Sequence, residues 1–149
     1  MKKILSIATL YFATPFILAG CASSSKTYVF PDKDDYQGYK IIDGVDKDTV
    51  FAKVETEDKI AVVLRDIATT SYSFIEPRYN NSMVHFDGKS QCCGPDSPLM
   101  GASGLIVYKF SFIGKGTTAI NIIARQKGLS VTASSFETDH VVTVNAEVK

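Results

Sequence analysis

From Thr49 onward the chain consists of short apolar stretches separated by polar turn residues, the pattern of β-strands. Residues 50–54 alternate in character, and residues 60–64 form a nearly continuous apolar run. The strongest strand signal covers residues 105–113. Its two faces are predicted to carry Leu105, Val107 and Lys109 on one side and Ile106, Tyr108, Phe110 and Phe112 on the other.

Further strands are predicted at residues 72–74, 83–86, 118–124 and 141–148, with turn residues between them. Asp87-Gly88 is expected to close the second of these, and Gly114-Lys115-Gly116 is the signal of a tight hairpin. The pattern predicts an all-β domain, an immunoglobulin-like β-sandwich of about seven to eight strands. The connection 88–103 is the longest, and loops of this length in a compact domain are usually functional or disordered.

The N-terminal segment predicts a lipoprotein. Lys2 and Lys3 precede a mostly apolar stretch, residues 4–18, which is too short to span a bilayer as a helix. Residues 18–21 (LAGC) resemble a bacterial lipobox, which implies cleavage before Cys21 and lipidation of that residue; the alternative is an ordinary secretory signal. Ala22, by resemblance to enterobacterial sorting, points to the outer membrane of the cell envelope.

Three segments are therefore expected. Residues 1–20 form the signal peptide, and residues 21–48 carry the lipid and a polar tether, part of which is apolar enough to add an edge strand. Residues 49–149 form the sandwich domain. Sixteen basic and sixteen acidic residues balance, which offers a nucleic-acid partner no electrostatic support. Abundant Val, Ile, Thr, Phe and Tyr agree with an all-β domain.

The connection that follows the run 60–64 has an unusual composition. Residues 66–74 read DIATTSYSF, with neither Gly nor Pro, although a loop that only turns the chain usually contains Gly, Asn or Pro. Small hydroxyl residues ending in Tyr72 suggest a contact surface. Two other segments join it at one end of the predicted sandwich: residues 101–104, before the strongest strand, and residues 125–128, after the strand 118–124.

The order and spacing of these segments resemble the chagasin family of cysteine-protease inhibitors, over residues 49–148. That family carries an Asn-Pro-Thr-Thr-Gly-Tyr loop, a Gly-x-Gly-Gly loop and an Arg-Pro-Trp loop. Matching residues in this chain are Thr69, Thr70 and Tyr72 for the first, Gly101 and Gly104 for the second, and Arg125 for the third. Other residues stand at the remaining motif positions: Ile67, Ala68, Ser71, Ala102, Ser103, Gln126 and Lys127.

The resemblance implies a three-part wedge that enters the cleft of a papain-like protease, with Thr69 and Thr70 over the catalytic cysteine and the other two loops gripping its sides. The glycines would permit close backbone approach, and Arg125 would hydrogen-bond across the interface. The implied binding residues are Ala68, Thr69, Thr70, Ser71, Tyr72, Gly101, Ala102, Ser103, Gly104, Arg125, Gln126 and Lys127. Loss of the family's Trp removes an aromatic anchor, and Ser71 restricts a position where the family has Gly.

Each loop also has a plain structural interpretation. The Thr-Thr segment could be a solvated connection, Gly101 and Gly104 could simply begin a strand, and Arg125 could be a surface charge. Cys92 and Cys93 are not explained by the family. In an oxidising compartment they are expected to form a vicinal disulfide, to bond another chain, or to stay as thiols.

No enzymatic site is predicted. His85 and His140 stand alone without a spaced CxxC, which argues against a metal site and makes a Cys–His nucleophile depend on spatial accident. No phosphate-binding Gly-rich loop is present, and no cofactor is expected. The leading hypothesis is a lipid-anchored inhibitor of a papain-like cysteine protease, belonging to a host or to the same organism. The alternative is an envelope interaction module with the same fold, which binds a surface or periplasmic protein without inhibiting proteases.

Overall fold

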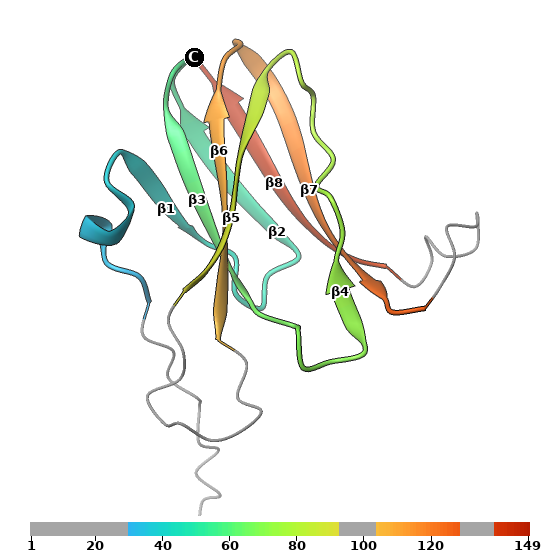
Figure 1. Cartoon of the computed structure of the whole chain (residues 1–149). Coiled ribbons are helices and arrows are strands. Elements are labelled where there is room, and N and C mark those ends of the chain that lie inside the picture. Colours follow the sequence, from blue (N-terminus) through green and yellow to red (C-terminus); the bar gives the residue numbers. More distant parts are fainter. Residues whose placement is uncertain (1–29, 93–103, 129–138) are drawn as a thin grey trace, which may run out of the picture.

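The computed structural model describes residues 30–92, 104–128 and 139–149, which form two facing β-sheets (Figure 1). Each sheet has four strands, in the orders β1-β3-β6-β5 and β2-β8-β7-β4. The elements are η1 (Lys33–Tyr36), β1 (Tyr39–Asp43), β2 (Thr49–Val54), β3 (Lys59–Arg65), β4 (Tyr72–Phe74), β5 (Val84–Cys92), β6 (Leu105–Phe112), β7 (Gly116–Gln126) and β8 (His140–Val148). The eight strands of the described residues confirm the predicted all-β sandwich. Those residues contain no helix long and apolar enough to cross a bilayer.

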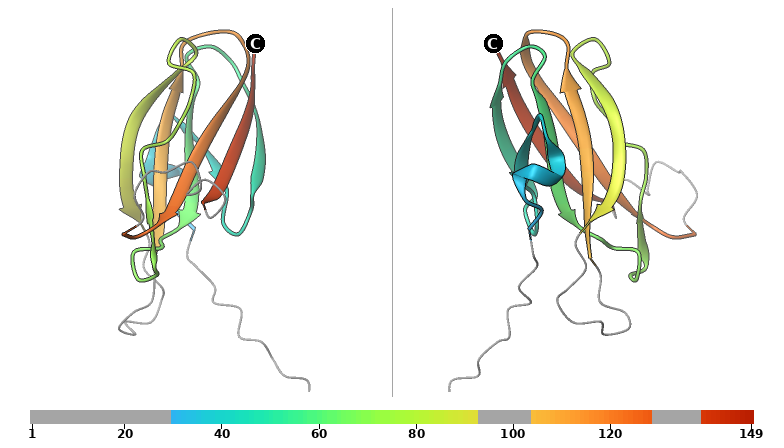
Figure 2. Two further views of the ribbon diagram at one scale, coloured as in Figure 1. Left: turned by 90° about the vertical axis from the view of Figure 1, so that its right-hand side faces the viewer. Right: turned by 60° about the vertical axis from the view of Figure 1, so that its left-hand side comes forward.

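The core lies between the sheets, as the two layers in Figure 2 show. The alternation predicted for the strongest strand is confirmed, because the four residues assigned to one face of β6 all belong to this core, among them Tyr108 and Phe110. The sheet β2-β8-β7-β4 contributes inward-facing residues such as Ile120, Ile122 and Val144, all of which are fully buried. Period-two alternation along each strand therefore places every second side chain between the layers.

The outer face of the β3–β6 pair is also buried. Val63 and Val107 are fully buried on that face, where Tyr36, Tyr39 and Ile41 from the N-terminal segment pack against them. Burial on both sides explains why the run 60–64 is apolar throughout instead of alternating. The segment 39–43, within the expected tether, forms β1, which pairs in parallel with β3 as an edge strand.

Two turn predictions were wrong. Asp87-Gly88 does not end a strand; β5 continues to Cys92, with a bulge between Phe86 and Gly88. Gly88 has φ +122°, a region that favours glycine, and the Asp87 carboxylate accepts hydrogen bonds from the hydroxyls of Tyr39 and Ser111. A β-bulge can contain the same residue types as a turn, here Asp followed by Gly, so the sequence alone does not distinguish the two. As a result the connection to β6 begins after Cys92, not at Gly88.

The second wrong prediction concerns Gly114-Lys115-Gly116. These residues do not form a hairpin between paired strands, because β6 and β7 belong to different sheets. They carry the chain across the end of the sandwich, where Gly114 lies so close to Ser82 that a Cβ there would be 2.8 Å from its carbonyl oxygen. The glycine signal marked the turn between β6 and β7, but only the tertiary structure shows that these two strands are not paired with each other.

Candidate functional site

The described strand ends that flank three connections lie at one end of the sandwich, the lower end in Figure 1. The antiparallel pairing of β3 with β6 sets Arg65, at the end of β3, opposite Leu105, at the start of β6. The pairing of β4 with β7 likewise sets Tyr72 opposite Gln126. The described strand ends that flank the connections β3–β4, β5–β6 and β7–β8 are therefore neighbours in space. Of the second connection only Gly104 is described; Gly101, Ala102 and Ser103 lie outside the described residues.

Residues 66–71, here called the Thr-Thr loop, are held by their own side chains. The Asp66 carboxylate accepts a hydrogen bond from the Ala68 amide at 2.9 Å. Thr70 donates to the Ile67 carbonyl through both its amide, at 2.9 Å, and its hydroxyl, at 2.8 Å. The Tyr72 amide donates to the Thr70 hydroxyl oxygen at 3.1 Å. Asp and Thr side chains can replace backbone partners in tight turns, which is why this loop needs neither Gly nor Pro.

Lys127, the first residue after β7, stabilises the Thr-Thr loop through hydrogen bonds. Its ammonium donates to the carbonyl oxygens of Ala68, at 3.0 Å, and Thr70, at 2.8 Å. Its backbone amide donates to the Ser71 carbonyl at 2.8 Å. Lys127 was predicted as a binding residue; the structure shows that its ammonium already positions the loop.

Replacing Lys127 with methionine is expected to loosen the Thr-Thr loop without unfolding the sandwich. Methionine keeps the aliphatic length but leaves two carbonyl groups without their donor, each bond contributing on the order of 1 kcal/mol. Amide hydrogen exchange at Thr70 and Tyr72 should accelerate about tenfold or more, while amides of β6 exchange as before. Lys115→Met, at the opposite end, is the matched control. Unchanged exchange at both loop amides would contradict the assignment.

Asp66 links the Thr-Thr loop to the second connection. Its backbone amide donates to the Gly104 carbonyl at 2.9 Å, and its carboxylate accepts a hydrogen bond from the Gln91 side chain at 2.9 Å. The half-buried Gly104 therefore takes part in the same network. Sequence reasoning missed Asp66 and Gln91; the only available signal was an Asp two residues before Ala68, the usual spacing of an Asx turn.

The exposed surface of the Thr-Thr loop consists of Ala68, Thr69, Thr70 and Ser71. Within the part of the chain that the structure describes, the Thr69 side chain makes no hydrogen bond, whereas the Thr70 hydroxyl is engaged inside the loop. Tyr72 is half-buried and packs edge-on against His140, with ring centroids 4.8 Å apart. Among the described residues, Thr69 and Ser71 are thus the exposed polar side chains of this loop that make no hydrogen bond and can contact a partner.

Arg125 does not lie where the motif comparison placed it. It belongs to β7 and is only 6% exposed. Its guanidinium forms a bidentate ion pair with Asp139. Nε donates to Oδ1 at 3.0 Å, and Nη2 donates to Oδ2 at 2.7 Å. Both charges are therefore paired inside the protein, and Arg125 holds the chain entering β8 instead of reaching outward. Gln126, the last residue of β7, is exposed.

The ion pair gives stability a defined pH dependence. Hydrogen bonds from Arg125 hold the pKa of Asp139 below its usual value of 3.8. A lowered pKa in the folded state means that this stabilisation is present above the unfolded-state pKa and is lost as pH falls through the folded-state pKa. Asp139→Asn should therefore lower Tm at neutral pH, and its difference from the wild type should shrink below the usual aspartate pKa.

Asp46→Asn is the matched control for this prediction. Asp46 pairs with Arg65 at 2.6 Å, but the two side chains are 67% and 40% exposed, so solvent screens their interaction. Thermal unfolding followed by circular dichroism from neutral to strongly acidic pH provides the measurement. If the two variants showed the same Tm at every pH, the Arg125–Asp139 pair would have no special role.

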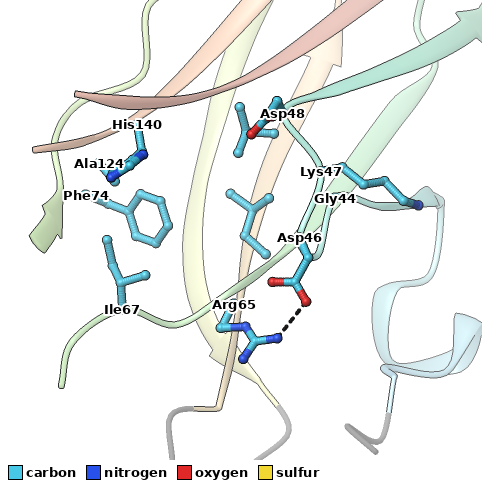
Figure 3. A pocket seen from close by; sticks show the side chains of 11 residues that line it. Gly44, Asp46, Lys47, Asp48, Arg65, Ile67, Phe74, Ala124 and His140 are labelled. Atoms are coloured by element: carbon cyan, nitrogen blue, oxygen red, sulfur yellow. Dashed lines mark hydrogen bonds and ion pairs between the residues drawn. The ribbon is translucent and has the colours of Figure 1, made fainter. Parts of the chain in front are cut away.

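A cavity of about 270 Å³ adjoins the Thr-Thr loop (Figure 3). Its apolar lining comes from both sheets and includes Leu64, Ile67, Phe74, Ala124 and Val142. The Arg65–Asp46 ion pair lies at one side, and His140 at another. The cavity could accept an apolar group at the loop end. Sequence analysis did not anticipate it, because its walls come from five separate segments.

Cys92 ends β5 opposite Leu105 and is disulfide-bonded. A vicinal bond to Cys93 was one of three alternatives considered; Cys93 lies outside the described residues, as does Cys21, so the vicinal pairing and the lipidation stay predictions. Among the described residues no three histidine, cysteine or acidic side chains gather in a way that could hold a metal ion.

No protein-family model and no curated protein matches the chain. Solved structures do. The cysteine protease inhibitor EhICP2 from Entamoeba histolytica aligns with a TM-score of 0.53 and 14% identity, covering 73% of this chain and 95% of that one. Amebosin aligns with a TM-score of 0.42 and 15% identity, over 74% and 98% of the two chains. PbICP-C, solved in complex with falcipain-2, aligns at 0.42 and 9%, over 74% and 99%. The likeness to EhICP2 concerns the fold alone: this chain has the immunoglobulin-like sandwich of chagasin type.

Proposed function

We propose that this protein inhibits papain-like cysteine proteases by placing the Thr-Thr loop in their active-site cleft. The supporting observation is an exposed loop pre-ordered by cross-loop hydrogen bonds from Lys127 and Asp66, on a fold shared with a cysteine protease inhibitor. An ordered loop loses little conformational entropy when it binds, so more of its contact energy appears as affinity. The inhibitor is proposed to act as a binding protein, without catalysis of its own.

The hydrogen bonds within the loop also favour resistance to cleavage. The carbonyls of Ile67, Ala68, Thr70 and Ser71 already accept hydrogen bonds from the protein itself. A peptide bond is cleaved only when its carbonyl reaches the nucleophile in a productive geometry. A loop held as a turn at four carbonyls would have to break these bonds before it could adopt such a geometry. It would therefore occupy the cleft without becoming a substrate.

Two flanking elements are proposed to contact the walls of the cleft. One is the segment 101–104, and the other comprises the exposed Gln126 and the residues beyond Lys127. Arg125 is assigned a structural part instead, since it is buried against Asp139. We further propose that Cys21 is lipidated and anchors the sandwich to a bacterial envelope membrane, most simply the outer membrane, through the segment that precedes residue 30. A protease encountered at that surface, from a host or from the same cell, is the proposed target.

Titration against papain and cathepsin L tests the proposal. The unlipidated chain 22–149, which keeps every described residue, should inhibit at least one of the two with an inhibition constant of about 1 μM or tighter, which corresponds to about −8 kcal/mol of binding. Mass spectrometry after prolonged incubation should find the Thr-Thr loop intact. Absence of inhibition at micromolar concentration for both enzymes would overturn the proposal and leave the envelope interaction module.

A further inference from the structure

The structure incorporates much of the expected tether into the fold. Residues 31–43 contain η1 and the edge strand β1, which pairs with β3. Tyr36 and Tyr39 pack against the apolar cluster on the outer face of β3 and β6, and Pro31 is buried. The Tyr39 hydroxyl also donates to the Asp87 carboxylate of β5 at 3.2 Å. A segment held by a strand ladder and by packed aromatic rings cannot serve as a spacer between the sandwich and a membrane.

Little chain remains between the fold and the proposed lipid. Cys21 stands nine positions before Phe30, the first described residue. Whatever conformation the residues between them adopt, covalent geometry limits their span to about 30 Å. A tether that continued to residue 48, as the sequence predicted, would have reached about 90 Å. The anchored sandwich is therefore confined close to the bilayer.

The described chain begins at the same end of the sandwich as the Thr-Thr loop. The Tyr36 hydroxyl lies 3.5 Å from that of Ser90, two residues before β5 ends at Cys92. The blue start of the chain lies toward this end in the views of Figure 1 and Figure 2, whereas the C-terminal Lys149 lies at the opposite end. A short tether at the loop end therefore turns the Thr-Thr loop toward the membrane.

A protein that binds the loop end from solution needs more room than this tether leaves. A globular protein of about 150 residues has a radius of gyration of about 15 Å and thus a diameter of about 40 Å. The bilayer, in contrast, lies no more than about 30 Å from the start of the fold. Such a partner fits only after the sandwich has tipped onto its side.

We propose that anchoring through Cys21 turns the Thr-Thr loop toward the membrane and restricts its access to proteases in solution. This restriction rests on the proposed inhibition and lipidation, and it regulates the same loop. The released chain is unrestricted, whereas a protease reaches the anchored chain only along the membrane surface. When the accessible orientations amount to about one tenth of the population, the apparent affinity falls about tenfold.

Attaching the chain to vesicles by either end tests this orientation without relying on protease inhibition. Chain 22–149 receives a hexahistidine tag before Ala22 or after Lys149, and phosphatidylcholine vesicles that contain a nickel-chelating lipid bind both forms. A fluorescein group on an azide-bearing residue at position 69 reports access, because a Fab fragment against fluorescein binds it only where a protein can reach the loop. On vesicles, the Fab should bind the N-terminally attached chain about tenfold more weakly than the C-terminally attached chain.

Three controls separate orientation from other effects. About 40 Gly and Ser residues inserted between Ser25 and Lys26 add a root-mean-square length of about 35 Å, which should restore Fab binding to the N-terminally attached chain. With the dye at position 81 instead, in the connection before β5 at the opposite end, the N-terminally attached chain should bind the Fab more tightly than the other. Without vesicles, the two chains should bind the Fab equally.

Equal Fab binding by the two attached chains, or a difference that the longer tether leaves unchanged, would overturn the inference. Papain inhibition is measured separately with the unlabelled chains in solution. Its absence would overturn the proposed function alone, because the Fab reports access to the loop directly. Where papain is inhibited in solution, N-terminal attachment to vesicles should weaken the inhibition about tenfold.

Discussion

Thr69→Asp should weaken inhibition of a papain-like protease by about 100-fold or more, which corresponds to about 2.7 kcal/mol of binding free energy. Thr69 is exposed, and its side chain makes no hydrogen bond within the described residues, so the folded protein should tolerate the change. In a closed protease cleft, however, the new carboxylate would lose its hydration without gaining a partner, and burying an unpaired charge is costly. Thr69 is preferred to Thr70, whose hydroxyl supports the loop.

Enzyme inhibition constants and Tm values for the same variant check this prediction. Asn81→Asp is the control, because it adds the same charge to an exposed position in the connection before β5, at the opposite end of the sandwich. It should leave both inhibition and Tm unchanged. If Thr69→Asp inhibited as well as the wild type, the Thr-Thr loop would not be the part that enters the cleft, and the proposed binding mode would be wrong.

Phe110→Ala should destabilise the sandwich by about 3–5 kcal/mol. Phe110 is fully buried in the core, with its ring centroid 5.3 Å from that of Phe86 and 6.0 Å from that of Tyr79. Truncation removes the transfer free energy of the ring and leaves a cavity that strands of both sheets cannot collapse to fill. Since a domain of this kind is stable by about 5–15 kcal/mol in total, the variant would be close to unfolding.

Phe51→Ala supplies the matched comparison for the core substitution. Phe51 lies on β2 and is 80% exposed, so the same chemical change should alter the free energy of unfolding by no more than about 0.5 kcal/mol. Urea unfolding followed by circular dichroism gives both values. Equal losses for the two variants would mean that Phe110 is not packed as the structure has it.

The strand pattern was predictable because burial imposes a period on each strand. The alternation of β6 and the apolar run of β3 identified both central strands before any pairing was known. Strand ends were harder to predict. A bulge at Asp87 and Gly88 carries the same residues as a turn, and only the partners Tyr39 and Ser111 reveal the difference.

The candidate site was only partly predictable. The Thr-Thr loop was identified by its composition, and the matching order of three segments led to the correct fold. Local resemblance assigned Arg125 to a partner, although the buried carboxylate of Asp139 already pairs with it. Lys127 was named as a contact, but its ammonium caps two carbonyls fifty-seven and fifty-nine positions away in the chain. A motif records which residues are present and not which of them are already bonded to one another.

The sequence by itself determined which segments become strands, which faces of them are buried, and that one loop is built of hydroxyl residues. These properties depend on neighbours along the chain, where side-chain period and turn chemistry act. Only the tertiary structure decided that Tyr36, Tyr39 and Ile41 cover the outer face of β3 and β6, that Lys127 orders the Thr-Thr loop, and that the buried Tyr108 hydroxyl has no hydrogen-bond partner in the described chain. These contacts join residues far apart in the chain, so no local pattern encodes them.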